Sequence, residues 1–283
     1  MDRLTIYQRL AADAATKGIA FSTHAKVALK IQKALEDTEC SVEHAARLVS
    51  SEPLLAARIV AMANSVAYNR SGREINDIKQ AVSLVGFRVV RTLAMAIVVR
   101  QLASTPRDPM HRAMAEKLWE HTSNVAALAY VLARRVSRLD AETALFAALV
   151  LEVGGFFLLS HAGQYPGLLD GDVADWGAEW RDDGDALVGR AVLRVLDVPE
   201  AVMQGIEGYW LRMLVLPPVS LGDTLTLANQ LSPVPSPLCE ESTATQAHDQ
   251  QLEIETAVGE RMLSEILEES AADVASLAKA LQF

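Results

Sequence analysis

Three side chains in this sequence could hold a metal ion or bind a polar ligand if the fold brought them together. His121 lies one residue away from the apolar stripe of its expected helix, and Glu152 stands in the middle of a strongly apolar run. Burying a carboxylate among apolar groups is costly unless the carboxylate is paired or hydrogen-bonded. Glu152 therefore faces a solvent-filled groove, meets an arginine, or joins His121 and Asp185 in a weak metal or ligand site. For His121 alone, a hydrogen-bonded core histidine is the simpler interpretation.

A second group of polar residues lies earlier in the chain. Arg88 and Arg91 are three residues apart and share one face of a helix, where they could receive a small anionic ligand or a protein partner. A solvated surface is the simpler interpretation of these two arginines. Asn64 and Ser65 end an apolar segment, and such side chains usually cap or turn the backbone there. We expect a structural role for this dipeptide, with a ligand role as the alternative.

The distribution of charge restricts the functions that these residues can serve. Residues 1–140 contain 20 Lys and Arg against 13 Asp and Glu, a net charge of +7, whereas residues 141–283 contain 6 against 23, a net charge of −17. The acidic half argues against bulk binding of nucleic acid, and the basic half could attract an anion or an acidic partner. The simpler interpretation is that the opposite charges help the two halves to dock.

Cysteine content and hydropathy indicate a cytoplasmic protein. Cys40 and Cys239 are far apart and neither has a second cysteine nearby, which fits a reducing compartment. The first residues lack the pattern of a secretory signal. The longest apolar run, residues 144–159, is shorter than the roughly 20 residues that cross a bilayer, so we expect a core helix and no membrane span. The common motifs of nucleotide-binding loops, zinc proteases and serine hydrolases are absent from the sequence.

The spacing of apolar residues predicts an all-α protein. Val27, Ile31 and Leu35 recur every four residues, and a longer stripe with three- and four-residue spacing runs from Met114 to Val136, as one face of a helix requires. Residues 163–183, rich in Gly, Asp and Trp, are expected to be mostly loop. Helices are predicted over residues 1–17, 24–37, 53–65, 109–137, 141–161, 184–196 and 199–210, from about 77 and again from 87 to 105, from about 217, and over 250–270 and 272–281.

Two stretches, in this order and spacing, resemble a known family. The first, EPLLAARIVAMANSVAYNRSGREINDIKQAVSLVGFRVVRTLAM, contains the dipeptide Asn64-Ser65, then Ile75 before a helix, then Gln-Ala leading to Gly86. The second, LWEHTSNVAALAYVLARR followed by AETALFAALVLEVGGFFLL, contains His121 in a Trp-Glu-His-Thr sequence. Together they are similar to the front and back halves of HDOD domains over about residues 20–230. The resemblance implies an all-α fold related to HD phosphohydrolases and a role in bacterial signal transduction.

The resemblance also divides the chain and locates the residues that stand where HD hydrolases bind metal. We expect a front lobe over residues 1–108, an HD-like lobe over 109–231, and C-terminal helices over 232–283 that pack on this body. His121 stands at the first metal position, Leu151 and Glu152 at the His-Asp pair, and Asn229 at the final Asp. We call these four residues the HD positions. Leu cannot bind a metal, and Asn is a poor ligand for a catalytic transition metal.

We therefore expect a regulatory module without catalytic activity, bound metal or cofactor. It would present a groove or surface to a protein partner in a signalling pathway, with or without gating by a small anionic ligand. One alternative is a divergent metal-dependent phosphohydrolase or phosphodiesterase that uses His121, Glu152 and Asp185. Another is a sensor of an anionic nucleotide second messenger that uses Arg88 and Arg91.

Overall fold

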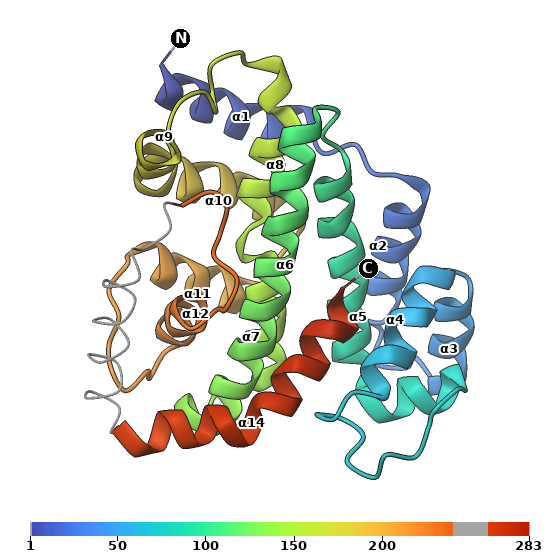
Figure 1. Cartoon of the computed structure of the whole chain (residues 1–283). Coiled ribbons are helices and arrows are strands. Elements are labelled where there is room, and N and C mark those ends of the chain that lie inside the picture. The colour runs from blue at the N-terminus through green and yellow to red at the C-terminus, as the bar shows by residue number, and fades with distance from the viewer. Residues whose placement is uncertain (1, 240–259, 283) are drawn as a thin grey trace.

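The computed structural model describes residues 2–239 and 260–282, and these residues form helices and no strand, so the all-α prediction is confirmed (Figure 1). The first part of the chain forms α1 (Arg3–Lys17), α2 (Thr23–Ala34), α3 (Val42–Ser50), α4 (Pro53–Ala63) and α5 (Ile78–Ser104). The second part forms α6 (Pro109–Leu132), η1 (Ala133–Ser137), α7 (Ala141–Leu151), α8 (Val153–His161), η2 (Ala162–Gln164), α9 (Val173–Glu179), η3 (Trp180–Gly184), α10 (Asp185–Val195), α11 (Glu200–Trp210), α12 (Leu221–Gln230) and α14 (Glu260–Leu281).

Short polar side chains begin many of these helices. Ser22, Ser41 and Asp140 each accept a hydrogen bond from a backbone N–H in the first turn of the following helix. Such caps satisfy amide groups that have no partner inside the helix. Gly86 interrupts α5 with a φ of 79°, a left-handed conformation that glycine adopts without strain, so the predicted break at this residue is observed.

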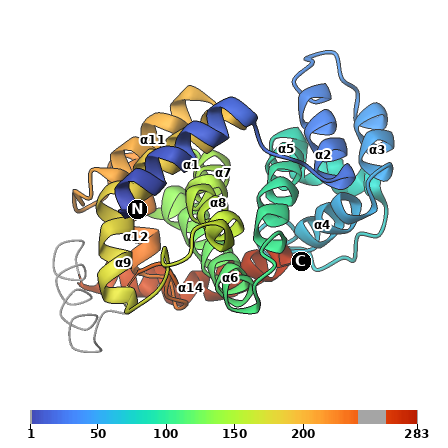
Figure 2. The same cartoon turned by 90° about the horizontal axis from the view of Figure 1, so that it is seen from above.

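Figure 2 shows the helices in two groups, with α2 to α5 on one side and α1 with α7 to α12 on the other. The long helix α5 packs on α6, α7 and α8 and so joins the groups through an apolar core. The leading helix α1 packs on α10, so residues 3–17 lie with the second group although they precede the first in sequence.

The C-terminal helix α14 also spans the two groups, because it packs on both α6 and α4. The backbone N–H of Val66 donates to Ser276 Oγ at 3.0 Å, and Arg135 forms an ion pair of 3.2 Å with Glu269. One continuous helix therefore stands where two helices, over residues 250–270 and 272–281, were predicted. Residues 250–259 of that prediction lie outside the described residues.

Two further predictions of secondary structure were wrong. The apolar stretch 141–161 forms two helices, α7 and α8, because Glu152 has a φ of −90° and a ψ of 15° and ends the first of them. Residues 163–183 contain α9 and η3, whose Trp176 and Trp180 are both 2% exposed, so burial of aromatic side chains orders a segment whose composition suggested a loop.

Two segments, Ile78–Ser104 and Ala141–Gln164, have the length and hydropathy of membrane spans. In the most apolar window of each, 67% and 83% of the residues are buried inside the fold. Burial of this kind is what the core helices of a folded domain show, and it matches the expectation that residues 144–159 are part of the core.

Candidate functional site: a buried polar cluster

Glu152 and Asp185 are brought together by a close crossing of α8 and α10. Gly154 and Gly189 face each other at this crossing, and a Cβ atom on Gly154 would lie 2.8 Å from the backbone nitrogen of Gly189. Only residues without side chains permit such an approach. The crossing places Glu152, at the junction of α7 and α8, beside Asp185, the first residue of α10.

Both carboxyl groups are buried, at 8% exposure each. Burial first, and the nearby charge of Asp185 second, raise the pKa of Glu152 to about 8 against the opposing effect of Arg212. Burial likewise raises the pKa of Asp185 to about 6, opposed by Arg212 and by the indole N–H of Trp210. Burial therefore favours the protonated form of both acids, and Arg212 opposes it.

Arg212 is the positively charged residue next to these two carboxyl groups. Its Nη2 lies 3.9 Å from Asp185 Oδ2 and also donates to the carbonyl oxygen of Arg181. Asp185 Oδ1 and Trp210 Nε1 are buried and form no hydrogen bond of good geometry within the described structure, although the indole lies near enough to lower the pKa of Asp185. Arg212 therefore pairs with Asp185, and it acts on Glu152 only through its charge.

His121 lies in the same region but has different partners. It is 2% exposed, and its Nδ1 donates to the carbonyl oxygen of Val234 at 2.6 Å. Burial lowers its pKa, against the opposing contacts of Val234 and Asn229, so the ring is neutral near pH 7. Its Nε2 is buried without a hydrogen-bond partner in the described structure.

Tyr209 connects the histidine to the acidic pair. Asn229 Nδ2 donates to the Tyr209 hydroxyl oxygen at 2.6 Å, and burial raises the pKa of Tyr209, as do the charges of Glu152 and Asp185. We refer to the buried residues His121, Glu152, Asp185 and Tyr209, together with the partly buried Asn229 and the exposed Arg212 beside them, as the buried polar cluster.

These donors do not fit a catalytic metal ion. Leu151 is 2% exposed and apolar, and Asn229 is bonded to Tyr209. Within residues 2–239 and 260–282, no three His, Cys, Asp or Glu side chains come together as metal ligands. His121, Glu152 and Asp185 are thus not brought together as metal ligands in the part of the chain that the structure describes.

The segment 232–239, which follows α12, contacts the buried polar cluster and the helix beside it. Val234 supplies the carbonyl oxygen on His121. Leu238 packs so closely on Gly155 that a Cβ atom there would lie 2.4 Å from Leu238 Cδ1. Burial first, and then the charges of Glu152 and Asp185, raise the pKa of the Cys239 thiol to about 11. A thiol with so high a pKa stays protonated and unreactive near pH 7.

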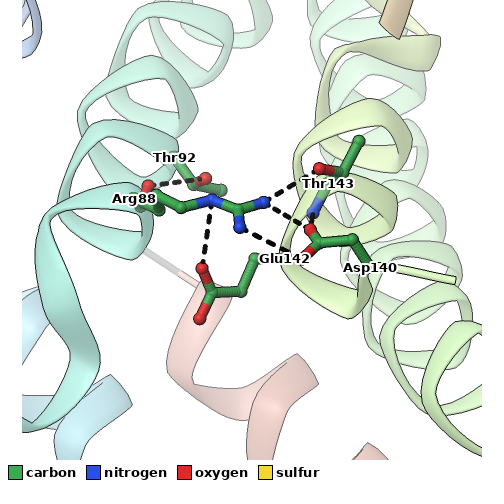
Figure 3. Close-up of polar contacts among 5 residues, drawn as sticks. All are labelled: Arg88, Thr92, Asp140, Glu142 and Thr143. Carbon is green, nitrogen blue, oxygen red and sulfur yellow. Dashed lines mark hydrogen bonds and ion pairs between the residues drawn. The ribbon is translucent and has the colours of Figure 1, made fainter. Parts of the chain in front are cut away.

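Arg88 forms a clasp between the two groups of helices, as Figure 3 shows. From α5, its Nη1 donates to Asp140 Oδ2 at 3.0 Å, its Nη2 donates to Thr143 Oγ1 at 2.9 Å, and its Nε lies 3.3 Å from Glu142 Oε2. The hydrogen bond from Arg88 is the main reason that the pKa of Asp140 falls to about 2. Arg88 is thus committed to an intramolecular contact outside the buried polar cluster.

Arg91 lines a cavity of about 200 Å³ next to this clasp. The cavity is bordered by residues of α2, α5, α7 and the start of α11, and three of its lining side chains are the carboxylates of Glu36, Glu142 and Asp197. Arg88 lines the cavity as well, so Arg91 lies in surroundings of mixed charge.

Asn64 and Ser65 fasten the loop that follows α4. The Asn64 amide donates to the carbonyl oxygens of Val60 and Ile75, and its oxygen accepts from the backbone N–H of Ile75 at 2.8 Å. Ser65 Oγ donates to the carbonyl oxygen of Met62 at 2.7 Å. These bonds to the backbone give the dipeptide the structural role that its residue types suggested.

Sequence reasoning missed the residues that complete the cluster. Arg212, Tyr209 and segment 232–239 reach it from parts of the chain far from Glu152, and no short motif relates them. The adjacent glycines Gly154 and Gly155, inside an apolar helical run, were the available signal, because glycine in a helix interior often marks a close approach.

A helical fold with a polar cluster at the HD positions defines an HD-related helical domain. The model of the HDOD domain matches residues 22–177, more than half of the sequence, and the chain belongs to the HDOD family. No curated protein matches the chain in sequence.

Solved structures share the fold at low identity. A candidate metal-dependent phosphohydrolase from Shewanella amazonensis SB2B has a TM-score of 0.77 and 22% identity, over 99% of this chain and all of that chain. An HDOD domain protein of unknown function from Geobacter sulfurreducens has a TM-score of 0.66 and 21% identity, over 98% of both chains. A candidate signal transduction protein from Marinobacter aquaeolei VT8 has a TM-score of 0.57 and 18% identity, over this whole chain and 67% of that one. At such identities the likeness establishes the fold alone.

Proposed function

We propose that the protein is a non-catalytic regulatory module of a bacterial signalling pathway, which acts in the cytoplasm by binding a protein partner. Membership of the HDOD family supports the general class. The absence of catalysis is supported by the side chains at the HD positions and by their contacts. Leu151 is apolar, Asn229 is bonded to Tyr209, and His121 donates to the carbonyl oxygen of Val234.

Hydrolysis of a phosphate ester in this type of site requires a metal-bound water and a metal clamp on the phosphoryl oxygens. Divalent ions need several nitrogen or oxygen donors at once. Glu152 and Asp185 lie beside each other, Asp185 is paired with Arg212, and segment 232–239 packs on α8 next to them. Both acids are buried, and the site lacks the histidine of the His-Asp pair.

Metal content and hydrolysis by the purified full-length protein test the proposal. We expect no stoichiometric Mn²⁺, Fe or Zn, no thermal stabilisation by these ions, and no hydrolysis of bis(p-nitrophenyl) phosphate or cyclic dinucleotides. A ligand that binds the native state raises its melting temperature with concentration, so weak binding would be visible. Mn²⁺-dependent hydrolysis that is lost in His121→Ala and kept in His111→Ala would contradict the proposal. His111 is a suitable control because it lies half-buried at the start of α6, outside the cluster.

The nucleotide-sensor alternative has less support. Arg88 is already paired with Asp140 and Glu142, and the cavity beside Arg91 is small for a nucleotide and sets three carboxylates against its two arginines. Salt-sensitive binding of a nucleotide that Arg91→Ala weakens would reverse this preference.

A further inference from the structure

The connection between α11 and α12 exposes a cluster of large apolar side chains. Leu211, Met213, Val215 and Val219 have exposed fractions of 72%, 71%, 51% and 67%. The other exposed large apolar side chains among the described residues are scattered over the chain. Single exposed apolar residues are normal in folded proteins, whereas several close together mark a surface that binds something. We name residues 211–219 the apolar loop.

The apolar loop is held in place from beneath. Asp223, in the first turn of α12 and 6% exposed, accepts hydrogen bonds from the backbone N–H groups of Val215, Val219 and Ser220 at 3.2, 3.4 and 3.0 Å. At the other end, Arg212 reaches the carbonyl of Arg181 and lies beside Asp185. The apolar side chains therefore stay exposed on a fixed backbone, and a partner that binds them pays little conformational entropy for ordering the loop.

Charge around the apolar loop selects among the surfaces that could cover it. The loop begins against η3, where Asp182 and Asp183 are exposed beside Arg181, and residues 141–239 contain 13 Asp and Glu against 4 Lys and Arg. A second copy that presented the same face would bring like charges together, and an anionic bilayer would be repelled. A partner with an apolar patch bordered by Lys and Arg would be attracted.

We propose that the apolar loop is a docking site for a protein partner that offers an apolar patch with a basic border. The inference rests on the proposed function, because it names the surface through which the regulatory module binds its partner. Leu211 and Met213 would be the main anchors, since they are the most exposed apolar side chains and a few central residues dominate the affinity of most interfaces.

A designed peptide serves as the probe for the full-length protein. A fluorescein-labelled helical peptide with Leu on one face and Lys on the other supplies the proposed chemistry, and fluorescence anisotropy gives its Kd. We expect binding that Met213→Ser and Val219→Ser each weaken by about tenfold, as loss of an apolar anchor does. Leu84→Ser, the same type of change at an exposed side chain of α5, is the matched control and should bind as the wild type does.

The same experiment with other probes separates the possible occupants. A peptide with Glu in place of Lys should bind at least tenfold more weakly, and amide hydrogen exchange should show that the Lys peptide protects residues 211–219. The inference is overturned if Met213→Ser binds the Lys peptide as tightly as the wild type, or if the Glu peptide binds equally well. It is also overturned if the wild type forms a dimer that Met213→Ser abolishes, or if the wild type binds phosphatidylcholine vesicles through the loop.

Failure of this inference and failure of the proposed function give different results. Metal-dependent hydrolysis would remove the non-catalytic function and leave the peptide data unchanged. Equal binding by Met213→Ser and the wild type would remove the docking site and leave the inactive HD positions unchanged.

Discussion

Replacing Glu152 by Gln should stabilise the protein increasingly as the pH rises. The folded state raises the pKa of Glu152 from its ordinary value of 4.5 to about 8, through burial first and the charge of Asp185 second. A carboxyl group with a raised pKa binds its proton more tightly in the folded state than in the unfolded state. The contribution of Glu152 to stability is therefore greatest below about pH 4.5, and it falls as the pH rises toward 8. Gln keeps the shape of the protonated side chain and does not ionise, so the variant does not lose stability at this position as the pH rises.

The size of the effect follows from the two pKa values. Each pH unit between them is worth about 1.4 kcal/mol, and the loss is complete only above the folded pKa. Between pH 6 and 8 the wild type should lose about 2 kcal/mol from Glu152. Asp185 has a pKa of about 6 in the folded state, at the lower edge of this pH window. Most of the change in stability that Asp185 causes therefore occurs below the window.

Urea unfolding at pH 6, 7 and 8 measures the effect as a difference between two proteins. We expect the gap in unfolding free energy between Glu152→Gln and the wild type to widen by about 2 kcal/mol over this window, while other ionisable groups cancel. Glu120→Gln, on the exposed side of α6, is the matched control and should follow the wild type. A constant gap for Glu152→Gln would mean that Glu152 is already ionised at pH 6 in the folded protein. That result would refute the argument that burial controls its pKa.

Three further changes test the packing around the cluster and between the helix groups. Gly154→Ala places a methyl group 2.8 Å from the Gly189 nitrogen and should lower the unfolding free energy by about 1–3 kcal/mol in urea. Arg88→Ala removes the clasp to Asp140 and should cost up to about 1 kcal/mol, with a smaller difference in 1 M salt if the contact is electrostatic. Leu277→Ala leaves a cavity under α14 and should cost about 2–5 kcal/mol, and limited proteolysis should then cleave α14 before the rest of the protein.

The helices were largely predictable because their signals are local. The polar caps at Ser22 and Ser41, the prolines in the first turns of α4 and α6, and the glycine break in α5 lie within a few residues of the features that they determine. The errors arose where distant contacts decide the structure. Trp176 orders α9 by burial against other elements, and the break at Glu152 serves a crossing of α8 over α10 that no local pattern indicates.

The sequence identified several residues of the candidate site but not how they are arranged in space. His121, Glu152 and Asp185 were identified from residue type and from the resemblance, but their grouping depends on which neighbours reach them in space. Val234 binds one nitrogen of His121 from 113 residues away, and Arg212 approaches Asp185 from the end of α11 with a left-handed backbone. Contacts between residues so far apart in the sequence produce no recognisable spacing of residue types.

Arg212 explains how a site without metal ligands can keep two buried carboxyl groups. Burial alone would drive both acids to their neutral forms. The guanidinium group lowers the pKa of Glu152 and of Asp185, and it reaches them from the beginning of the apolar loop, where Arg212 has a φ of 55°. A bound metal ion would supply positive charge at such acids and could exchange its water for a substrate. Arg212 supplies positive charge from a side chain of the protein itself, 3.9 Å from Asp185. A side chain cannot exchange for a substrate as metal-bound water can, which is in keeping with the non-catalytic role that we propose.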